Sequence, residues 1–316
     1  MKVLITSRSF GKIGDSAKKV LTDAGIEIDN ISVGFDQAHF EKIIPEYDAL
    51  IIGAHDFSEA DMERCPNLKI ICKHGVGLDN IHVNKAKELG IAVCNAPGTN
   101  SNAVADLALG LMLSVCRKIS HSAALVREGV WKSHIGEDVC GKTVGLLGFG
   151  AIAKGVARRA RGFGMNIMAF DPFVPAEAME AEGVIVAKSL EDLYENSHFV
   201  SLHIPATEQT KNSIGYNLLS RMPKGGCLVN TARKEVINEE GLIKALKERE
   251  DLKYITDVPT ANHAAMAEEF GKRVFGTPKK MGAETGEANV NAGLAAANQI
   301  VDFFTTGNTK FQVNKQ

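Results

Sequence analysis

Charged side chains follow three apolar, strand-like runs in the second half of this sequence. Arg233 follows GCLVNTA, Asp257 closes YITD, and two lysines, Lys279 and Lys280, follow RVFGTP. Open α/β sheets bind ligands where the carboxyl ends of parallel strands meet. There a guanidinium can bind the carboxylate and carbonyl oxygens of a 2-oxo acid together, and a lysine can transfer a proton. Each cation could instead be a solvated surface charge.

Other strand-like runs also end in groups suited to binding. The run LKIICKHG leads into VGLDN, where Lys73 and the backbone N–H groups of Gly75, Val76 and Gly77 could meet a substrate carboxylate. In the second half, two further strand ends offer candidate contacts for a ligand or cofactor: His203, Ile204 and Pro205 after one strand, and Thr231 and Ala232 after the other.

A glycine-rich turn joins the run KTVGLLG to the helical pattern KGVARRARGFG. Its letters, GFGAIA, match the dinucleotide-binding fingerprint with alanine in the third position. Gly148 would permit the tight turn, and Gly150 would let the backbone approach a pyrophosphate at the helix N-terminus. The alternative is a glycine-rich turn that binds no cofactor. The predicted contacts are Gly148, Phe149, Gly150, Ala151, Ile152, Asp171 and Pro172.

Asp171 decides which dinucleotide is predicted. It ends the strand that follows the fingerprint helix, where a carboxylate accepts hydrogen bonds from ribose hydroxyls. Its charge would repel a 2′-phosphate, and the segment DPFVP supplies no arginine to reverse that repulsion. The sequence therefore predicts NAD rather than NADP.

These residues need parallel sheets to position them, and the sequence has that pattern. Short β-branched runs alternate with helical patterns, at 2–7, 48–54, 68–75, 91–96, 142–148, 166–171, 198–205, 226–232, 254–258 and 273–278. Two long helical stretches, about 102–117 and 284–304, bracket the second series of strands. We predict an α/β fold with two doubly wound parallel-sheet domains. Residues 1–98 and 286–316 form a substrate-binding domain, and residues 99–285 form a nested NAD-binding domain.

The bulk composition argues against several classes of function. A formal net charge of −2 gives no basic surface for nucleic acid or an anionic membrane. No apolar run reaches the roughly 20 residues of a membrane span. The six cysteines are dispersed without a CxxC motif, so we expect free buried thiols in a cytoplasmic protein and no metal site.

The chain resembles the D-2-hydroxyacid dehydrogenases over essentially its whole length. The matching segments are KHGVGLDNI (73–81), NAPGTNSNAVADLALGLML (95–113), VW (130–131), GKTVGLLGFGAIAKGVA (141–157), DPF (171–173), SLHIPATEQTKNSIG (201–215), CLVNTARKEVINEEGL (227–242) and ITDV (255–258). The resemblance implies a flavodoxin-like substrate domain, a nested Rossmann domain and a cleft between them. It implies that Arg233 binds the substrate and polarises its carbonyl, and that Asp257 holds the nicotinamide amide. It also suggests a homodimer through the NAD domain, with the long helix from Asn102 as a contact.

The lysine pair is where the chain departs from this family. The family usually has Thr-Pro-His-apolar-Gly-Ala, with the histidine as general acid/base and a glutamate that orients it. Here Lys280 takes the place of the histidine and Asn262 takes that of the glutamate. Two interpretations are open: Lys280 replaces the histidine, or the site is inactive. The first would need a neutral lysine in the oxidation direction, with its pKa lowered by burial or by a cation such as Arg233. Glu284 or Glu287 could orient it.

A lysine-bearing subgroup, the D-3-phosphoglycerate dehydrogenases without a regulatory domain, is similar at four further places. These are NTARKE, EREDLKYITDV, TPKKMGAET and FQVNK. We therefore predict that Lys280 is the general acid/base, that Lys279 is a solvated neighbour, and that the substrate is 3-phosphoglycerate in serine biosynthesis. Since the sequence stops at Gln316, we expect no serine feedback module.

The substrate remains the open part of this prediction. Related enzymes often carry a phosphate-binding arginine after the third strand, but the segment here, IIGAHDFS, has none. His55 and Lys73 are possible substitutes. The alternatives are reduction of another small 2-oxo acid, such as glyoxylate or hydroxypyruvate, and a non-catalytic NAD-sensing corepressor.

Overall fold

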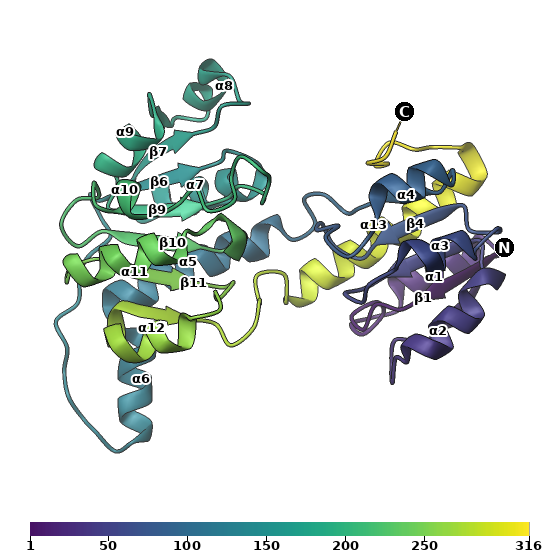
Figure 1. Ribbon diagram of the computed structural model, residues 1–316, viewed down its shortest axis with the longest axis horizontal. Coiled ribbons are helices and arrows are strands. Elements are labelled where there is room, and N and C mark those ends of the chain that lie inside the picture. Colours follow the sequence, from purple (N-terminus) through teal and green to yellow (C-terminus); the bar gives the residue numbers. More distant parts are fainter. Residues whose placement is uncertain (316) are drawn as a thin grey trace. The chain divides into compact units, whose positions relative to one another are not determined.

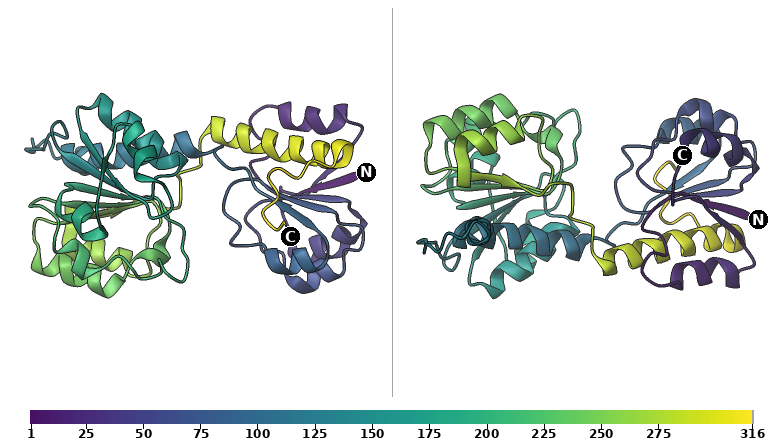
Figure 2. Two further views of the ribbon diagram at one scale, coloured as in Figure 1. Left: turned by 90° about the horizontal axis from the view of Figure 1, so that it is seen from above. Right: turned by 90° about the horizontal axis from the view of Figure 1, so that it is seen from below.

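The computed structural model describes residues 1–315, which form two compact units. Unit 1 contains Met1–Asn100 and the segment that starts at Ala283, and unit 2 contains Ser101–Gly282. Each unit is built around one parallel sheet with helices on both faces (Figures 1 and 2). The predicted α/β fold with two parallel-sheet domains is confirmed.

Unit 1 has a five-stranded sheet in the order β2-β1-β3-β4-β5. The strands are β1 (Lys2–Ile5), β2 (Glu27–Asn30), β3 (Ala49–Ile52), β4 (Ile70–Lys73) and β5 (Ala92–Cys94). The helices are α1 (Ser16–Asp23), α2 (Gln37–Ile43), α3 (Glu59–Glu63), α4 (Val83–Glu88) and α13 (Gly286–Thr306), with a short 3₁₀ turn η1 (Ile44–Glu46). This strand order is the flavodoxin-like one.

Two apolar layers hold unit 1 together. Helices α1 and α13 pack side by side on one face of the sheet, and α2, α3 and α4 cover the other (Figure 2). A Cβ on Gly293 of α13 would lie 3.3 Å from Cβ of Ala17 in α1, so the absence of a side chain lets these two helices approach closely. The C-terminal segment lies along β5, where the N–H of Val313 donates to the carbonyl of Val93 at 2.8 Å.

Unit 2 has a seven-stranded sheet in the order β12-β11-β10-β9-β6-β7-β8. The strands are β6 (Thr143–Leu147), β7 (Asn166–Phe170), β8 (Ile185–Val186), β9 (Phe199–Leu202), β10 (Cys227–Asn230), β11 (Lys253–Thr256) and β12 (Val274–Gly276). The helices are α5 (Ser101–Arg117), α6 (Ile119–Arg127), α7 (Ala151–Gly162), α8 (Ala176–Ala181), α9 (Leu190–Glu195), α10 (Tyr216–Leu219), α11 (Glu239–Glu248) and α12 (His263–Phe270), with 3₁₀ turns η2 (Lys234–Val236) and η3 (Gly271–Arg273). The first six strands have the Rossmann order and β12 extends it.

The central strands form where the sequence is apolar without alternation. All four residues of β9 and of β10 are buried, as expected for strands covered on both faces. The two strands that sequence patterns did not predict, β2 and β8, both lie at sheet edges. Strand β2 reads EIDN and is mostly exposed, and β8 has only two residues, so neither carries an apolar run.

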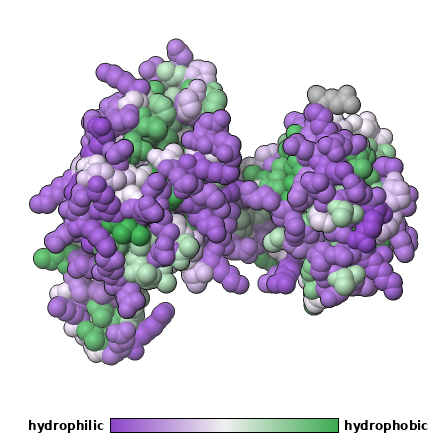
Figure 3. Space-filling model, viewed as in Figure 1, coloured by the Kyte–Doolittle hydropathy of each residue, from purple (hydrophilic) through white to green (hydrophobic). Residues whose placement is uncertain are grey.

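Helix α6 and the extended segment 128–139 form an arm that projects from the rest of unit 2 (Figure 1). Lys118 separates α5 from α6 with a left-handed backbone, φ 53°. Hydrophobic atoms gather at the tip of this arm (Figure 3). The exposed apolar side chains of the arm are Ile119, Val126, Val130, Trp131 and Ile135. None of the helices within residues 1–315 combines the length and apolar character that crossing a membrane requires.

Candidate active site

The turn between β6 and α7 is shaped to admit a ligand against backbone. Gly148 has φ +87°, and a Cβ there would lie 2.7 Å from the carbonyl oxygen of His203, so this position needs glycine. Gly150 is the N-cap of α7 and offers no side-chain cap, and nothing lies within 4 Å of the position of a Cβ on it. The first N–H groups of α7 therefore face open space at the positive end of the helix, as a pyrophosphate requires.

Asp171 follows β7, and its carboxylate links the β6–α7 turn to the loop after β7. One of its carboxylate oxygens accepts from the N–H of Phe149 at 2.8 Å, and the other accepts from the N–H of Phe173 at 2.9 Å. A carboxylate has about four acceptor positions, so ribose hydroxyls can still bind. Pro172 and Phe173 are exposed beside it. The residues of the turn and the acid thus fit the adenosine half of NAD.

The loop after β9 closes over this turn. The N–H of His203 donates to the carbonyl of Leu147 at 2.8 Å. Nε2 of His203 is buried and has no hydrogen-bond partner among the described residues. Burial lowers the pKa of His203 to about 4, so the ring is neutral at physiological pH. Ile204 lies against Gly148, and Pro205 is exposed.

The loop after β10 is shaped by Asn230. Its amide accepts from the N–H of Ala232 at 3.0 Å and donates to the carbonyl of Arg233 at 2.9 Å. Thr231 is buried, and its hydroxyl has no hydrogen-bond partner within residues 1–315, so it could bond to a cofactor. Arg233 is half-buried, and one guanidinium nitrogen donates to the carbonyl of Ala232 at 2.9 Å.

Asp257 is fully buried at the end of β11, and its carboxylate anchors the turn that carries the two lysines. One oxygen accepts from the hydroxyl of Thr277 at 2.6 Å and from the N–H of Met281 at 2.7 Å. The other accepts from the N–H of Gly282 at 2.8 Å. Three of its acceptor positions are therefore used within the protein, a role that sequence reasoning missed. Contact with a nicotinamide amide stays a prediction.

The two lysines lie on this anchored turn. Both Lys279 and Lys280 are exposed, and the hydroxyl of Thr277 also approaches the carbonyl of Lys279 at 2.7 Å. Within unit 2, Lys280 is therefore exposed to water and is not buried, as the predicted lowering of its pKa by burial would require. The role of Lys280 as acid/base remains a prediction.

Asn262, where the family has its orienting glutamate, is engaged elsewhere. Its backbone N–H donates to Glu239 at 3.0 Å, and its side-chain amide donates to the second carboxylate oxygen of Glu239 at 2.9 Å. This pair joins the start of α12 to the start of α11. The structure thus pairs Asn262 with Glu239 of the same unit.

In unit 1, the loop after β4 brings together the predicted carboxylate-binding residues. Gly75 has φ +136°, and its carbonyl accepts from the N–H of Ala96 at 2.8 Å. The side chain of Asn95 donates to the carbonyl of Val76 at 2.8 Å. Gly77 follows, and Lys73 Nζ donates to the carbonyl of Gly53 at 2.6 Å. These contacts hold the loop open in an ordered shape.

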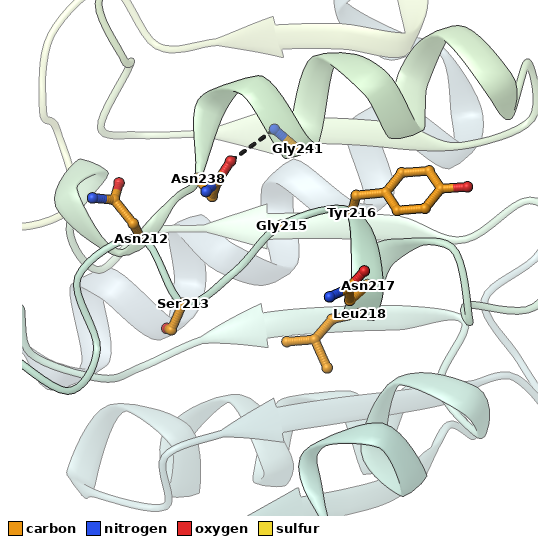
Figure 4. Close-up of a pocket in the computed structure, with 8 residues that line it drawn as sticks. All are labelled: Asn212, Ser213, Gly215, Tyr216, Asn217, Leu218, Asn238 and Gly241. Atoms are coloured by element: carbon orange, nitrogen blue, oxygen red, sulfur yellow. Dashed lines mark hydrogen bonds between the residues drawn. The ribbon is translucent and has the colours of Figure 1, made fainter.

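A pocket of about 230 Å³ lies away from all these residues. It is lined by Asn212, Ser213, Gly215, Tyr216, Asn217, Leu218, Asn238 and Gly241, at the starts of α10 and α11 (Figure 4). Asn238 points at the N–H of Gly241 and caps α11 at 2.8 Å (Figure 4). None of the predicted site residues lines this pocket. Among the described residues, no group of three or more His, Cys, Asp or Glu could hold a metal ion.

Comparisons with known proteins agree with this geometry. Residues 109–278 match the family model described as D-isomer specific 2-hydroxyacid dehydrogenase, NAD binding domain. A D-3-phosphoglycerate dehydrogenase of Methanocaldococcus jannaschii is 35% identical over 307 residues, which cover 95% of this chain and 57% of that protein. The chain therefore spans just over half the length of this curated relative.

Two further matches are named for different substrates. A hydroxypyruvate reductase of Thermotoga maritima is 43% identical over 219 residues, covering 68% of this chain and 70% of that protein. The crystal structure of NAD⁺-bound 3-phosphoglycerate dehydrogenase from Entamoeba histolytica has a TM-score of 0.86 and 39% identity, covering 100% of this chain and 99% of that one. These matches confirm the family resemblance and the assignment of NAD as cofactor.

Proposed function

Because the chain belongs to the D-isomer specific 2-hydroxyacid dehydrogenases, we propose that it is an NAD-dependent oxidoreductase of a small 2-hydroxy acid. More specifically, we propose that it interconverts 3-phosphoglycerate and 3-phosphohydroxypyruvate. The observation that carries the proposal is the lysine turn Thr277–Gly282, held by buried Asp257 at the same carboxyl edge of the sheet as the dinucleotide-binding turn after β6. Similarity over nearly the whole of this chain to two enzymes named as phosphoglycerate dehydrogenases supports the finer substrate.

The residues of unit 2 divide the chemistry between them. Bound NAD would supply the hydride acceptor for oxidation of the C2 carbinol. Arg233 would bind the substrate carboxylate and draw electron density from the C2 oxygen. Lys280 would take the hydroxyl proton in oxidation and return it in reduction, which requires the neutral amine in the first case and the ammonium in the second. In unit 1, Lys73 and the Gly75–Gly77 loop would bind the carboxylate.

A second candidate is reduction of hydroxypyruvate or glyoxylate. The higher identity to a hydroxypyruvate reductase, 43% over 219 residues, favours it. A non-catalytic NAD-sensing corepressor is the third, and the presence of both Arg233 and Asp257 counts against it.

A substrate panel separates the three functions. Formation or loss of NADH would be followed at saturating cofactor with 3-phosphoglycerate, 3-phosphohydroxypyruvate, hydroxypyruvate and glyoxylate. A kcat/KM that is highest for the phosphorylated pair supports the first proposal. A higher value for hydroxypyruvate or glyoxylate supports the second. No turnover with any of them, together with NAD binding by calorimetry, supports the third.

We also propose a homodimer through unit 2, in the cytoplasm. The apolar side of α5 is largely buried within unit 2, whereas the arm of α6 and residues 128–139 exposes Trp131 at 84% and Ile135 at 92%. Apolar side chains so exposed at the tip of a projecting arm favour burial against a second copy. The six free thiols support a reducing compartment.

A further inference from the structure

The loop after β1 carries an arginine that the assignments above leave unused. We propose that Arg8 is the residue that selects a phosphorylated substrate, by binding the phosphate at the carboxyl edge of the unit 1 sheet. This inference rests on the proposed function, since it presupposes a phosphorylated hydroxy acid.

Arg8 lies at the switch point of the sheet. In the order β2-β1-β3-β4-β5, the chain leaves β1 toward one side to form β2 and returns on the other side as β3. All these strands are parallel, so the loops after β1, β3 and β4 emerge at the same edge. Open α/β sheets bind ligands in the crevice where the strand order reverses, here between β1 and β3. Arg8 follows β1, and Lys73 ends β4, which is separated from β1 by β3.

The loop around Arg8 is held in place on both sides. A Cβ on Gly53 would lie 2.9 Å from Cα of Ser7, so glycine at that position lets the β1 loop sit against the end of β3. Ser9 Oγ lies 3.2 Å from His74 Nδ1, and His74 Nε2 lies 3.2 Å from the carbonyl of Asn289. Arg8 itself is exposed, and the structure records no hydrogen bond or ion pair for its side chain within residues 1–315. A fixed backbone thus presents an available guanidinium.

The two cations that the sequence offered for phosphate have other contacts. His55 Nε2 lies 2.7 Å from Thr6 Oγ1, and Nδ1 lies 2.9 Å from the carbonyl of Asp56. Its ring stacks on Phe35 with 4.3 Å between centroids. Burial, and to a lesser extent the charge of Lys73, lowers the pKa of His55, so the ring is neutral. A neutral ring with both nitrogens engaged cannot neutralise a phosphate.

Lys73 is also engaged within unit 1. Its ammonium donates to the carbonyl of Gly53, after β3, and to the side chain of Asn80. Arg8 and Lys73 then bind the two ends of a phosphorylated hydroxy acid separately. A guanidinium suits the phosphate because its planar fork makes two parallel hydrogen bonds to phosphate oxygens.

The test compares two substrates that differ in the phosphate. The kcat/KM for 3-phosphohydroxypyruvate and for hydroxypyruvate would be measured with NADH for the wild type, Arg8→Gln, Arg8→Lys and Lys12→Gln. Lys12 is the matched control, an exposed cation four positions further along the same loop. We expect Arg8→Gln to lower the value for the phosphorylated substrate by about 10- to 100-fold and to change the value for hydroxypyruvate far less. Arg8→Lys should be intermediate, and Lys12→Gln should resemble the wild type.

Inorganic phosphate provides a second readout. It should inhibit the wild type competitively against 3-phosphohydroxypyruvate, and Arg8→Gln should raise its inhibition constant in parallel with the loss of kcat/KM. An equal loss on both substrates, or no loss on either, overturns the role of Arg8 and leaves the proposed function standing. A wild type that does not prefer the phosphorylated substrate overturns the proposed function and the inference with it.

Discussion

Lys280 owes its position to Asp257, a buried carboxylate more than twenty residues earlier in the chain. The carboxylate accepts three hydrogen bonds from the turn Thr277–Gly282, so the backbone on either side of the two lysines is fixed. Charge-assisted hydrogen bonds of this kind are stronger than neutral ones. The side chain of Lys280 is therefore exposed, but the backbone that carries it is held in place by hydrogen bonds.

Replacing Lys280 tests its role as a proton carrier. We expect Lys280→Ala to lower kcat by about 10² or more while NAD affinity persists, because a general acid/base contributes 10²–10⁴ in rate. Lys280→Arg should be nearly as slow, since arginine keeps the charge but cannot give up its proton. NADH binding by fluorescence and turnover by absorbance measure the two effects. If Lys279→Ala is the more damaging change, the wrong lysine has been assigned.

His203 makes a separate prediction about acid stability. Its pKa is lowered from 6.5 to about 4 by burial, whereas in the unfolded chain it keeps its ordinary value. The unfolded state therefore binds more protons in this range, and the free energy of unfolding falls as the pH drops from 6.5 toward 4. A shift of this size corresponds to about 3 kcal/mol.

The variant His203→Gln isolates this contribution, because the other histidines are unchanged. The difference in free energy of unfolding between wild type and variant should shrink by about 3 kcal/mol between pH 7 and pH 4. Urea denaturation at several pH values would measure it. Parallel curves for the two proteins would mean that His203 titrates normally in the folded state.

At the scale of the elements, the turn from β6 to α7 contains two glycines with different roles. The fold requires Gly148, and we expect cofactor binding to require Gly150. Gly148→Ala would place a Cβ 2.7 Å from the carbonyl oxygen of His203 at φ +87°, so we expect a loss of several kcal/mol in stability. Gly150→Ala meets nothing within 4 Å, so its stability should stay within about 1 kcal/mol of the wild type.

NAD affinity should respond differently from stability at these two glycines. Gly150→Ala should weaken NAD binding by at least about tenfold, because the new methyl group would occupy the space where the pyrophosphate approaches the backbone. Calorimetric titration with NAD and thermal denaturation of the same samples would measure both quantities. Unchanged NAD affinity in Gly150→Ala would place the pyrophosphate elsewhere.

The elements that could be predicted from the sequence are those whose formation depends on residues close together in the chain. The turn Gly148–Gly150 and its flanking strand and helix follow from neighbouring residues, and the structure has all three. The edge strands β2 and β8 lack an apolar run and form only because a sheet edge is there to pair with. The hydrogen bonds of Asp257 with Thr277 and Gly282 join segments that are distant in the sequence, so no local sequence pattern predicts them.

Candidate site residues show the same limit. Arg233, Lys280 and the loop Gly75–Gly77 could be picked out because they follow strands. His55 also follows a strand, but its contacts with Thr6 and Phe35 assign it to the fold instead. Packing between distant segments decides which strand-end side chains face a ligand and which contact each other. A single sequence does not show this packing.

For the whole molecule, the arm predicts an oligomeric state. We expect Trp131→Glu combined with Ile135→Glu to convert a dimer into a monomer, because burying a carboxylate at an apolar contact is costly. Val33→Glu is the control, since Val33 is 94% exposed in unit 1. Sedimentation velocity at several concentrations measures the result. A wild type that sediments as a monomer at every concentration would contradict the proposed dimer.

The pairing of α1 with α13 constrains the order in which the chain can fold during synthesis. Helix α1 is synthesised before unit 2, but its apolar partners Ala296, Ala297 and Ile300 are synthesised after it. Unit 2 lies wholly between them and can fold first, although domains usually fold from the N-terminus as they are made. The face of the unit 1 sheet that α13 covers therefore stays incompletely covered until unit 2, Ser101–Gly282, has been synthesised.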